Sequence, residues 1–370
     1  ECGVYMYDLS KITESSTIER IGKITTDGKG DGMSLIERDG RIYLFAATGH
    51  HTYSASTSSP LDNLCYGQGN GMDIYDVTDP ANPKWLSTAK IDGRYYYTDN
   101  DYWETEVGYD EENDKYYAYL VNTYNGVYVF DVTNLNAPVR LAKAEIVLPL
   151  GSSTPALKHA DRAIITPWDQ SVSNRGPVGA ILICDGKLYI AGTDSDIHVL
   201  ENDSLIFGHK EENTTSASLD NLVDSFYDFD NTLSGGSISS LANGSFVQYK
   251  TEGQALGAVT YGNYLYVAAG AEGGVILDKA TLAKVGTIAP TSVSGRVGFA
   301  SGIDAADGKL YVAEDVAGLR VYDISGEKAT APALLWRYNT GSEIARDVVL
   351  SPGAIFSLVA YSTNRLWVIN

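Results

Sequence analysis

Three of the five histidines in this chain lie in two stretches that also carry carboxylates. His50 and His51 are adjacent, and His159 stands two residues before Asp161. Imidazole and carboxylate groups together are the usual ligands of zinc and related metals. Adjacent histidines rarely bind one ion, however, because their side chains diverge. We therefore favour loop histidines in ordinary hydrogen bonds, and keep a transition-metal site serving a metal-dependent hydrolase as the alternative.

The chain is rich in carboxylates, yet no stretch has the spacing of a calcium-binding loop. Residues 27–32 read Asp-Gly-Lys-Gly-Asp-Gly, which is superficially similar to such a loop. Lys29 occupies its third position and Arg38 its twelfth, where ligand oxygens are required. A second acidic cluster has no standard spacing either: Asp224, Asp228 and Asp230. We predict a turn at 27–32 and no cofactor, with calcium as an alternative.

A group of aromatic side chains is suited to binding sugars or a protein partner, because aromatic rings stack well on both. The group comprises Tyr95, Tyr96, Tyr97, Trp103 and Trp168. The competing interpretation is that these rings fill the interior of their own loops. A carbohydrate-binding protein is therefore a further alternative.

The short motifs of common catalytic sites are absent from the sequence. It has no Gly-x-Ser-x-Gly, no His-Glu-x-x-His and no phosphate-binding glycine loop. A glycosidase needs two carboxylates a few ångströms apart. Nothing singles out such a pair among 47 acidic residues. We therefore expect a protein that is not an enzyme.

The composition narrows the range of partners. With 27 basic and 47 acidic residues the formal net charge is −20, so we expect no nucleic acid, which needs a basic surface. No apolar run approaches the roughly 18 residues of a membrane helix. The 26 tyrosines, few cysteines and a start at Glu1 suggest a processed, secreted protein, extracellular or at the cell surface. Three sequons would then be glycosylation candidates: Asn202, Asn213 and Asn243.

One short phrase recurs along the chain and predicts the fold. It runs Gly, a hydrophobe, any residue, a β-branched or aromatic residue, a hydrophobe and Asp. Its full copies lie at 3–8, 71–76, 126–131 and 318–323, and its weaker copies at 196–200, 274–278 and 365–370. Periodic phrases of this kind are typical of repeat architectures.

Two further apolar runs precede most copies of the phrase, and another apolar run follows, so that each repeat contains four runs. Asp-Gly, Gly-Asn and Pro-Gly pairs between them are typical of hairpin turns. Four antiparallel strands, repeated at roughly 45 to 75 residues, make a β-propeller blade. With strands lettered A to D from the channel outward, the phrase is strand C. Its closing Asp is expected to bond nearby backbone amides. The prediction is an all-β, single-domain propeller over residues 1–370.

The phrase and its flanks resemble a known repeat. The stretches are Gly318-Leu-Arg-Val-Tyr-Asp-Ile-Ser325, Tyr75-Asp-Val-Thr-Asp-Pro-Ala-Asn-Pro83 and Ala345-Arg-Asp-Val-Val349. They are similar to the LVIVD repeat over most of the chain outside three insertions. The resemblance implies a β-propeller, often in secreted or surface-attached proteins. It carries no shared catalytic residues.

The strand count does not close into whole blades. Seven C strands are expected, but only six are preceded by A and B strands, and the last blade stops at Asn370 without a D strand. We predict seven four-stranded blades with one shared between the termini, or six blades with a spare strand. The third option is that the spare strand completes a neighbouring subunit, because an unpaired edge invites strand addition.

The three insertions can be assigned to faces of the propeller. Residues 47–70 form a B–C loop and 148–178 a D–A loop, which share one face. Residues 201–245 form a C–D loop on the opposite face. The first two contain His50, His51, His159 and Trp168. Long loops of this kind commonly carry function.

The cysteines suggest one disulfide. Cys2 precedes the first C strand and Cys65 lies in the 47–70 insertion, so both are expected on the same face. A Cys2–Cys65 bond would stabilise the N-terminal strand by roughly 4 kcal/mol in the chain-entropy model. The rival hypothesis is that Cys2 bonds another subunit. Cys184 is expected to be a buried free thiol.

The main hypothesis is therefore a non-enzymatic extracellular or cell-surface propeller that acts as a binding or assembly scaffold. Self-association through the terminal strands, as in a fibre, is the first partner expected. Another extracellular protein or a glycan is the second.

Overall fold

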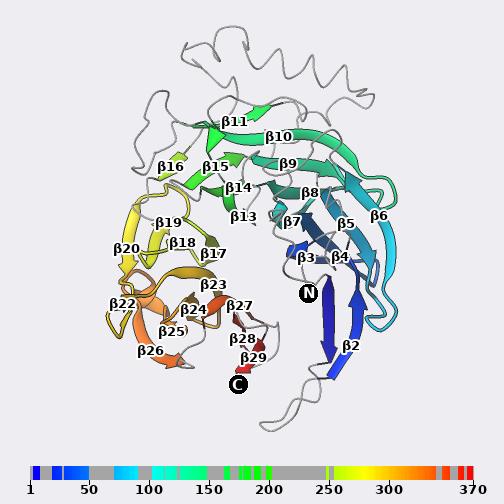
Figure 1. Ribbon diagram of the computed structural model, residues 1–370. Helices are drawn as coiled ribbons and strands as arrows, with labels where there is room; N and C mark the ends of the chain where they lie inside the picture. The colour runs from blue at the N-terminus through cyan, green and yellow to red at the C-terminus, as the bar shows by residue number, and fades with distance from the viewer. Residues whose placement is uncertain are drawn as a thin grey trace, which may run out of the picture. The chain divides into compact units, whose positions relative to one another are not determined.

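The structure is a computed structural model in which nearly all described residues lie in β-strands (Figure 1). The described residues are 3–8, 19–26, 29–49, 71–90, 102–111, 113–122, 126–147, 162–166, 175–176, 178–184, 187–192, 197–201, 247–249, 254–338, 344–350, 357–361 and 365–369. None of the helical turns in these ranges is long and apolar enough to span a membrane. The chain divides into two compact units, one mainly of residues 1–145 and the other mainly of 176–204 and 239–370.

The first unit contains three sheets. The first sheet consists of β1 (Val4–Asp8) and β2 (Glu19–Ile24). The second consists of β3 (Lys29–Arg38), β4 (Arg41–Gly49), β5 (Gly71–Asp76) and β6 (Lys84–Lys90). The third sheet contains β7 (Tyr102–Asp110), β8 (Lys115–Asn122), β9 (Gly126–Asp131), β10 (Val139–Val147), β11 (Arg162–Thr166) and β12 (Arg175–Gly176). Within each sheet, apart from β11 and β12, each strand pairs antiparallel with the strand that follows it in the chain.

The second unit repeats the same order. Its first two sheets are β13 (Val178–Cys184), β14 (Lys187–Gly192), β15 (Ile197–Glu201) and β16 (Val247–Tyr249), then β17 (Gly257–Tyr261), β18 (Tyr264–Ala268), β19 (Gly274–Asp278) and β20 (Lys284–Ile288). A hairpin of β21 (Ser292–Val293) and β22 (Arg296–Val297) follows. The last two sheets are β23 (Ala300–Ala306), β24 (Lys309–Glu314), β25 (Leu319–Asp323) and β26 (Ala333–Tyr338), then β27 (Ala345–Leu350), β28 (Ser357–Tyr361) and β29 (Arg365–Ile369). The short 3-10 turn η4 (Gly326–Ala329) lies between β25 and β26.

The recurring phrase is strand C in each copy, as the sequence predicts. It forms the third strand of six sheets, and in the N-terminal pair β1 is followed by β2 as a C–D pair. The number of blades differs from the prediction. The described residues show four sheets of four strands, not seven or six. The other blade-like sheets have two strands (β1 and β2), six strands (β7 to β12) and three strands (β27 to β29) in the described residues.

The insertion at 148–178, expected to be a loop, contributes strands of its own. β11 pairs with β10 on the outer side of the third sheet, and β12 also pairs with β10. The D strand of this blade is therefore not an edge. A blade of this chain accepts an added strand at its D side.

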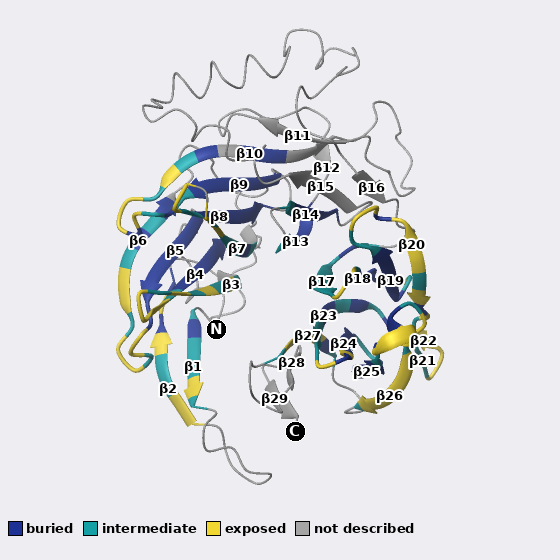
Figure 2. Ribbon diagram, turned by 180° about the vertical axis from the view of Figure 1, so that it is seen from behind, coloured by how far each residue is buried: buried dark blue, intermediate teal, exposed yellow. Residues whose placement is uncertain are grey.

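The central strands are mostly apolar because both of their faces are buried between blades. In β18, Leu265 and Val267 pack toward the preceding blade. Tyr266 and Ala268 pack toward the following one. Successive side chains of a strand point to opposite faces, so a blade buried on both sides needs apolar residues at both parities. Burial is dark blue in these inner strands and yellow along much of the outer strands β6, β20 and β26 (Figure 2).

The A–B hairpins have the turn chemistry that the sequence predicts. Asp39-Gly40 and Asp307-Gly308 form two-residue loops in which all four residues have positive φ, between 51° and 71°. This is the type I′ geometry, which matches the twist of the strands it joins.

Consecutive blades approach each other closely at a glycine in strand D. A Cβ at Gly286 of β20 would lie 2.1 Å from the carbonyl oxygen of Thr330, in the C–D connection of the next blade. We expect Gly286→Ala to lower the free energy of unfolding by about 1–3 kcal/mol, the usual cost of overpacking. Urea denaturation followed by circular dichroism measures it.

Val285→Ala is the matched control, because Val285 is the neighbouring residue and is 40% exposed. We expect it to change the free energy of unfolding by roughly 0.5 kcal/mol or less. Equal effects of the two substitutions would contradict close contact between these blades.

Candidate functional site

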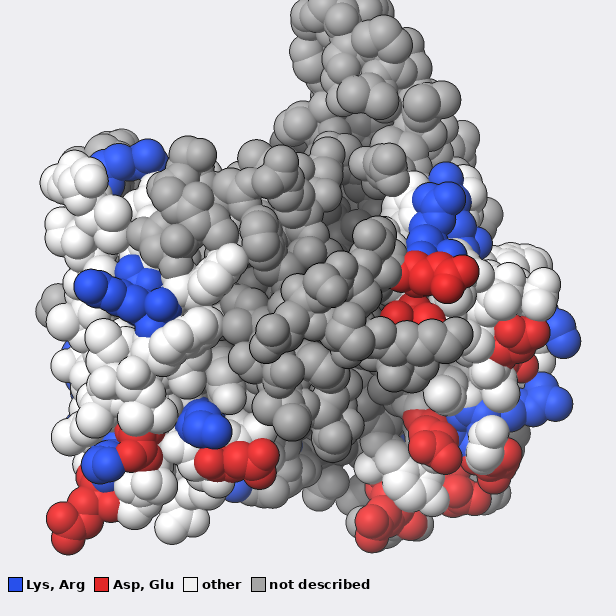
Figure 3. All heavy atoms as spheres, turned by 90° about the horizontal axis from the view of Figure 1, so that it is seen from below, with Lys and Arg blue, Asp and Glu red and all other residues white. Residues whose placement is uncertain are grey.

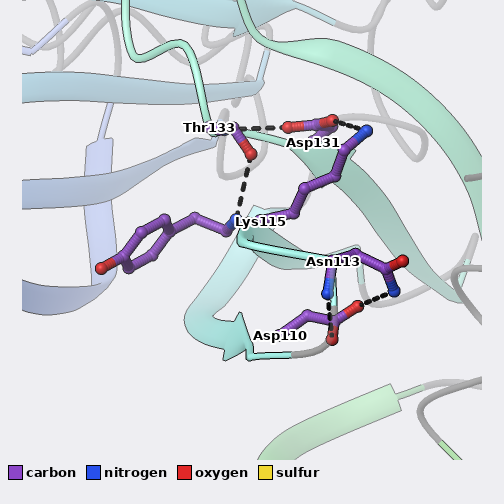
Figure 4. Close-up of polar contacts among 6 residues, drawn as sticks. Asp110, Asn113, Lys115, Asp131 and Thr133 are labelled. Carbon is purple, nitrogen blue, oxygen red and sulfur yellow. Dashed lines mark hydrogen bonds and ion pairs between the residues drawn. The ribbon is translucent and has the colours of Figure 1, made fainter. Parts of the chain in front are cut away.

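The closing Asp of the phrase bonds the backbone of the turn that follows it. At the end of β9, Asp131 Oδ1 accepts the N–H of Thr133 at 2.9 Å, and Oδ2 pairs with Lys115 Nζ at 3.2 Å (Figure 4). The Thr133 hydroxyl oxygen accepts the N–H of Tyr116 at 3.0 Å. The turn is thereby attached to the start of strand B. This confirms the expected role of the closing Asp, and we call the motif the Asp-anchored turn.

The Asp-anchored turn recurs in both units. The equivalent bonds at the ends of β5, β19 and β25 are Thr78 N–H to Asp76 (3.0 Å), Ala280 N–H to Asp278 (3.1 Å) and Ser325 N–H to Asp323 (2.9 Å). A hydrogen bond to a carboxylate favours its charged form. The bonds from Thr78 lower the pKa of Asp76. Burial alone would raise the pKa of Asp131, but the bonds from Thr133 and Lys115 outweigh it and the pKa is lowered.

The anchored turns also receive side chains from the preceding blade. Their carbonyl oxygens accept from Arg38 Nη1 (Thr133 O, 2.8 Å), Ser87 Oγ (Leu135 O, 2.5 Å), Tyr189 Oη (Lys279 O, 3.4 Å) and Tyr266 Oη (Ala329 O, 3.0 Å). Carbonyl groups in a turn have no strand partner, so a neighbouring donor satisfies them. The turn thus ends one blade and joins it to the blade before.

A buried ion pair in the second unit was not foreseen from the sequence. Arg320 and Glu314 are 1% and 3% exposed. Arg320 Nε lies 3.7 Å from Glu314 Oε2, and Glu314 Oε1 accepts the N–H of Thr291 at 2.6 Å. The pair therefore fixes the connection between β20 and β23. Arg320 stands at the third position of the phrase, which we treated as open to any residue. A charged residue between apolar neighbours in a central strand was the available signal.

One carboxyl group titrates in the neutral range. Burial raises the pKa of Glu106, on the A strand β7, to about 7. A carboxyl of this kind can exchange protons near neutral pH, which makes it a site candidate by electrostatic criteria. The sequence analysis did not identify Glu106, because its shifted pKa depends on burial. In the part of the chain that the structure describes, no group of three or more His, Cys, Asp or Glu side chains is placed to hold a metal ion.

Most residues that the sequence singled out lie outside the described residues. These are Cys2, His50, His51, Cys65, Tyr95, Tyr96, Tyr97, His159, Asp161, Trp168, Asn202, Asn213 and Asn243. Trp103 lies in β7, where only its backbone is described. The metal, aromatic, disulfide and glycosylation hypotheses therefore stay predictions. Cys184 is described as a free cysteine, half-buried, and its Sγ accepts from Thr260 Oγ1 at 3.4 Å.

Charged side chains are interspersed on the face seen in Figure 3. Among the atoms described there, Lys and Arg lie beside Asp and Glu, with uncharged areas between them. The described part of this face therefore offers mixed charge rather than one extended basic or acidic surface.

The role of the Asp-anchored turn can be tested at Asp131. We expect Asp131→Ala to lower the free energy of unfolding by about 1–2 kcal/mol, because the N–H of Thr133 and Lys115 lose their partner. Asp131→Asn keeps an acceptor oxygen and should lose less. Urea denaturation at pH 7 gives both values. Identical stability of wild type and Asp131→Ala would refute the anchoring role.

Acid should weaken the same interaction in the wild type. The folded pKa of Asp131 is depressed below its ordinary value of 3.8, so its contribution is present above that pH and is lost as the pH falls through the folded pKa. The stability difference between wild type and Asp131→Ala should therefore shrink at acid pH.

Glu106 predicts a dependence in the opposite direction. Its folded pKa of about 7 lies above the ordinary 4.5, so the folded state binds the proton more tightly and stability falls as pH rises between these values. Glu106→Gln cannot ionise. We expect it to match the wild type near pH 4 and to be more stable by about 1–3 kcal/mol at pH 8. Parallel pH profiles of melting temperature for the two proteins would rule this out.

Comparison with known proteins agrees with this description. The family model for the LVIVD repeat matches residues 252–279 and 297–340. No curated protein matches the chain. Among solved structures, the chain is similar to the computationally designed Ika8 protein, with a TM-score of 0.51 and 8% identity over 100% of this chain and 91% of that one. It is also similar to Raptor of Chaetomium thermophilum, with a TM-score of 0.54 and 10% identity over 95% of this chain and 24% of that one.

At these identities the solved structures bear on the fold alone, and the chain spans about a quarter of the length of Raptor. The repeat match covers β17–β19 and the blade β23–β26, and both belong to sheets with the four-stranded antiparallel order. Residues 252–279 and 297–340 therefore match the LVIVD repeat, and the described sheets have the four-stranded antiparallel order of β-propeller blades.

Proposed function

We propose that this protein is a non-enzymatic scaffold, outside the cell or at its surface, that assembles with other copies through its terminal strands. The observation that carries the proposal is the incompleteness of its first and last sheets. In the described residues β1 has β2 on one side and no B strand on the other. β29 has β28 on one side and no D strand on the other.

The free edges of β1 and β29 can pair with each other. An unpaired edge presents alternating N–H and C=O groups, which pair with any strand of suitable register. Pairing of β29 with β1 of another copy would give a sheet running β28, β29, β1, β2 across two molecules. Repetition of that contact would build a linear assembly. Closure of one chain on itself, with seven or six blades, is the competing outcome.

The composition supports a surface role. A net charge of −20 keeps unassembled copies apart. The three sequons are glycosylation candidates if the protein is secreted. The aromatic and histidine-containing loops are left for a second partner, an extracellular protein or a glycan, rather than for assembly.

Mass photometry over a range of concentrations, with negative-stain electron microscopy, tests the proposal. We expect linear oligomers that lengthen with concentration. An excess of a synthetic peptide of residues 3–24 should occupy the β29 edge and shorten them, whereas a scrambled peptide should not. The peptide leaves the protein intact, so loss of folding cannot account for the result. A protein that stays monomeric at high concentration, with both termini protected from proteolysis, would contradict the proposal.

A further inference from the structure

We infer that β26 is a second self-association surface, which pairs edge to edge with β26 of another copy. The inference deepens the proposed assembly role. It rests on that role only for the assumption that copies of the chain associate. It names a surface distinct from the terminal strands. The two surfaces can therefore succeed or fail separately.

Exposed apolar side chains lie on both faces of β26. Leu334, Leu335 and Trp336, here called the outer strip, are 52%, 53% and 41% exposed. Figure 2 shows β26 exposed along nearly its whole length. Trp336 stacks on Tyr338 with ring centroids 5.9 Å apart. Arg337 is the one charged residue among the six of this strand.

The outer strip departs from the rule of the other D strands. The D strands β2, β6 and β20 each have a bulge, and the residue just after it is small: Gly22, Ser87 and Gly286. In β26 the same register position, opposite Val321, holds Trp336. The register position that holds a small residue in three blades therefore holds a tryptophan in this blade.

The small residues are required because the C–D connection of the next blade lies against them. A Cβ at Gly22 would be 1.9 Å from Pro80 O, and one at Gly286 would be 2.1 Å from Thr330 O. Ser87 Oγ donates to Leu135 O at 2.5 Å. An indole at 336 excludes a connection of that geometry. The outer strip is therefore not shaped to receive a regular following blade.

The edge of β26 also lacks the usual protection. Exposed edge strands are commonly guarded by lysine, which opposes pairing with another chain. The D strand β6 begins at Lys84 and ends at Lys90, and β20 begins at Lys284. β26 begins at Ala333, contains no lysine, and is the outermost strand of its sheet in the described residues.

The bulge does not prevent strand addition, because β10 provides a precedent. β10 has the same irregularity opposite β9, between Arg140 and Ala142. It nevertheless pairs with β11 and β12 on its other side. A bulged D strand of this chain therefore accepts a further strand.

Self-pairing also fits the charges. In an antiparallel pair centred between Leu335 and Trp336, each Leu335 faces a Trp336 and each Arg337 faces a Leu334, so no like charges oppose each other. The outer strip has no carboxylate, whereas two copies of net charge −20 repel each other elsewhere. A two-fold contact of identical strands is the commonest form of self-association. Salt should strengthen it by screening the repulsion.

Analytical ultracentrifugation of the full chain and two variants tests the inference. We expect a dimer that strengthens with salt, and Leu335→Lys should raise its dissociation constant at least about tenfold, a change of about 1.4 kcal/mol. Val285→Lys is the matched control, because Val285 is the bulged residue of β20 and is 40% exposed. It should leave the dimer unchanged. Hydrogen exchange should show slower amide exchange in β26 on dimerisation and no change in β20.

Trp336→Ser, which restores the small residue of β6, is the second variant and should also weaken the dimer. Equal dimerisation of Leu335→Lys and Val285→Lys, or a wild type that stays monomeric at every salt concentration, would overturn the inference. The peptide of residues 3–24 separates the two surfaces. It should shorten linear assemblies without dissociating the β26 dimer, so loss of either contact alone identifies which proposal is wrong.

Discussion

The described blades depend on one repeated interaction, in which the carboxylate closing strand C holds the backbone of the next turn. The chain leaves the strand ladder there, so its N–H groups need another acceptor. Asp131 supplies it to Thr133, and Asp323 supplies it to Ser325. The fixed turns then offer carbonyl oxygens to the preceding blade, where Arg38 and Tyr266 donate to them. One residue type at one register position therefore both ends a blade and joins it to its neighbour.

Because the repeat uses its inner strands for packing between blades, it limits which residues can bind other molecules. The inner strands are buried on both faces, as Leu265 and Tyr266 illustrate from opposite sides of β18. Even the charged groups of the inner strands serve packing, since Arg320 pairs with Glu314 at a D–A connection. Contacts with other molecules are left to strand edges and long loops. The D strands differ at their edges, and β26 with Trp336 departs furthest from the common pattern.

The sequence predicted those parts of the fold that local chemistry determines. Strand C followed from its Gly-to-Asp pattern, and the A–B turns followed from pairs such as Asp39-Gly40, whose positive φ needs no distant contact. Addition of β11 to β10 depends on a long-range pairing that no local pattern encodes, and the number of complete blades depends on partners for β1 and β29. The ion pair of Arg320 was missed for the same reason. The histidine candidates and Trp168 lie in long insertions, whose sequence carries no repeat to position them.

Native-state hydrogen exchange of Asp323→Ala tests most directly whether the anchored turn joins the blades. Tyr266 donates to Ala329 O, and Gly286 lies against Thr330 O, within the connection that follows Asp323. We predict faster amide exchange at residues 325–331 and also in β18 and β20 of the preceding blade, with β13 and β14 unchanged. Faster exchange confined to 325–331 would contradict the account, because the turn would then stabilise only its own blade.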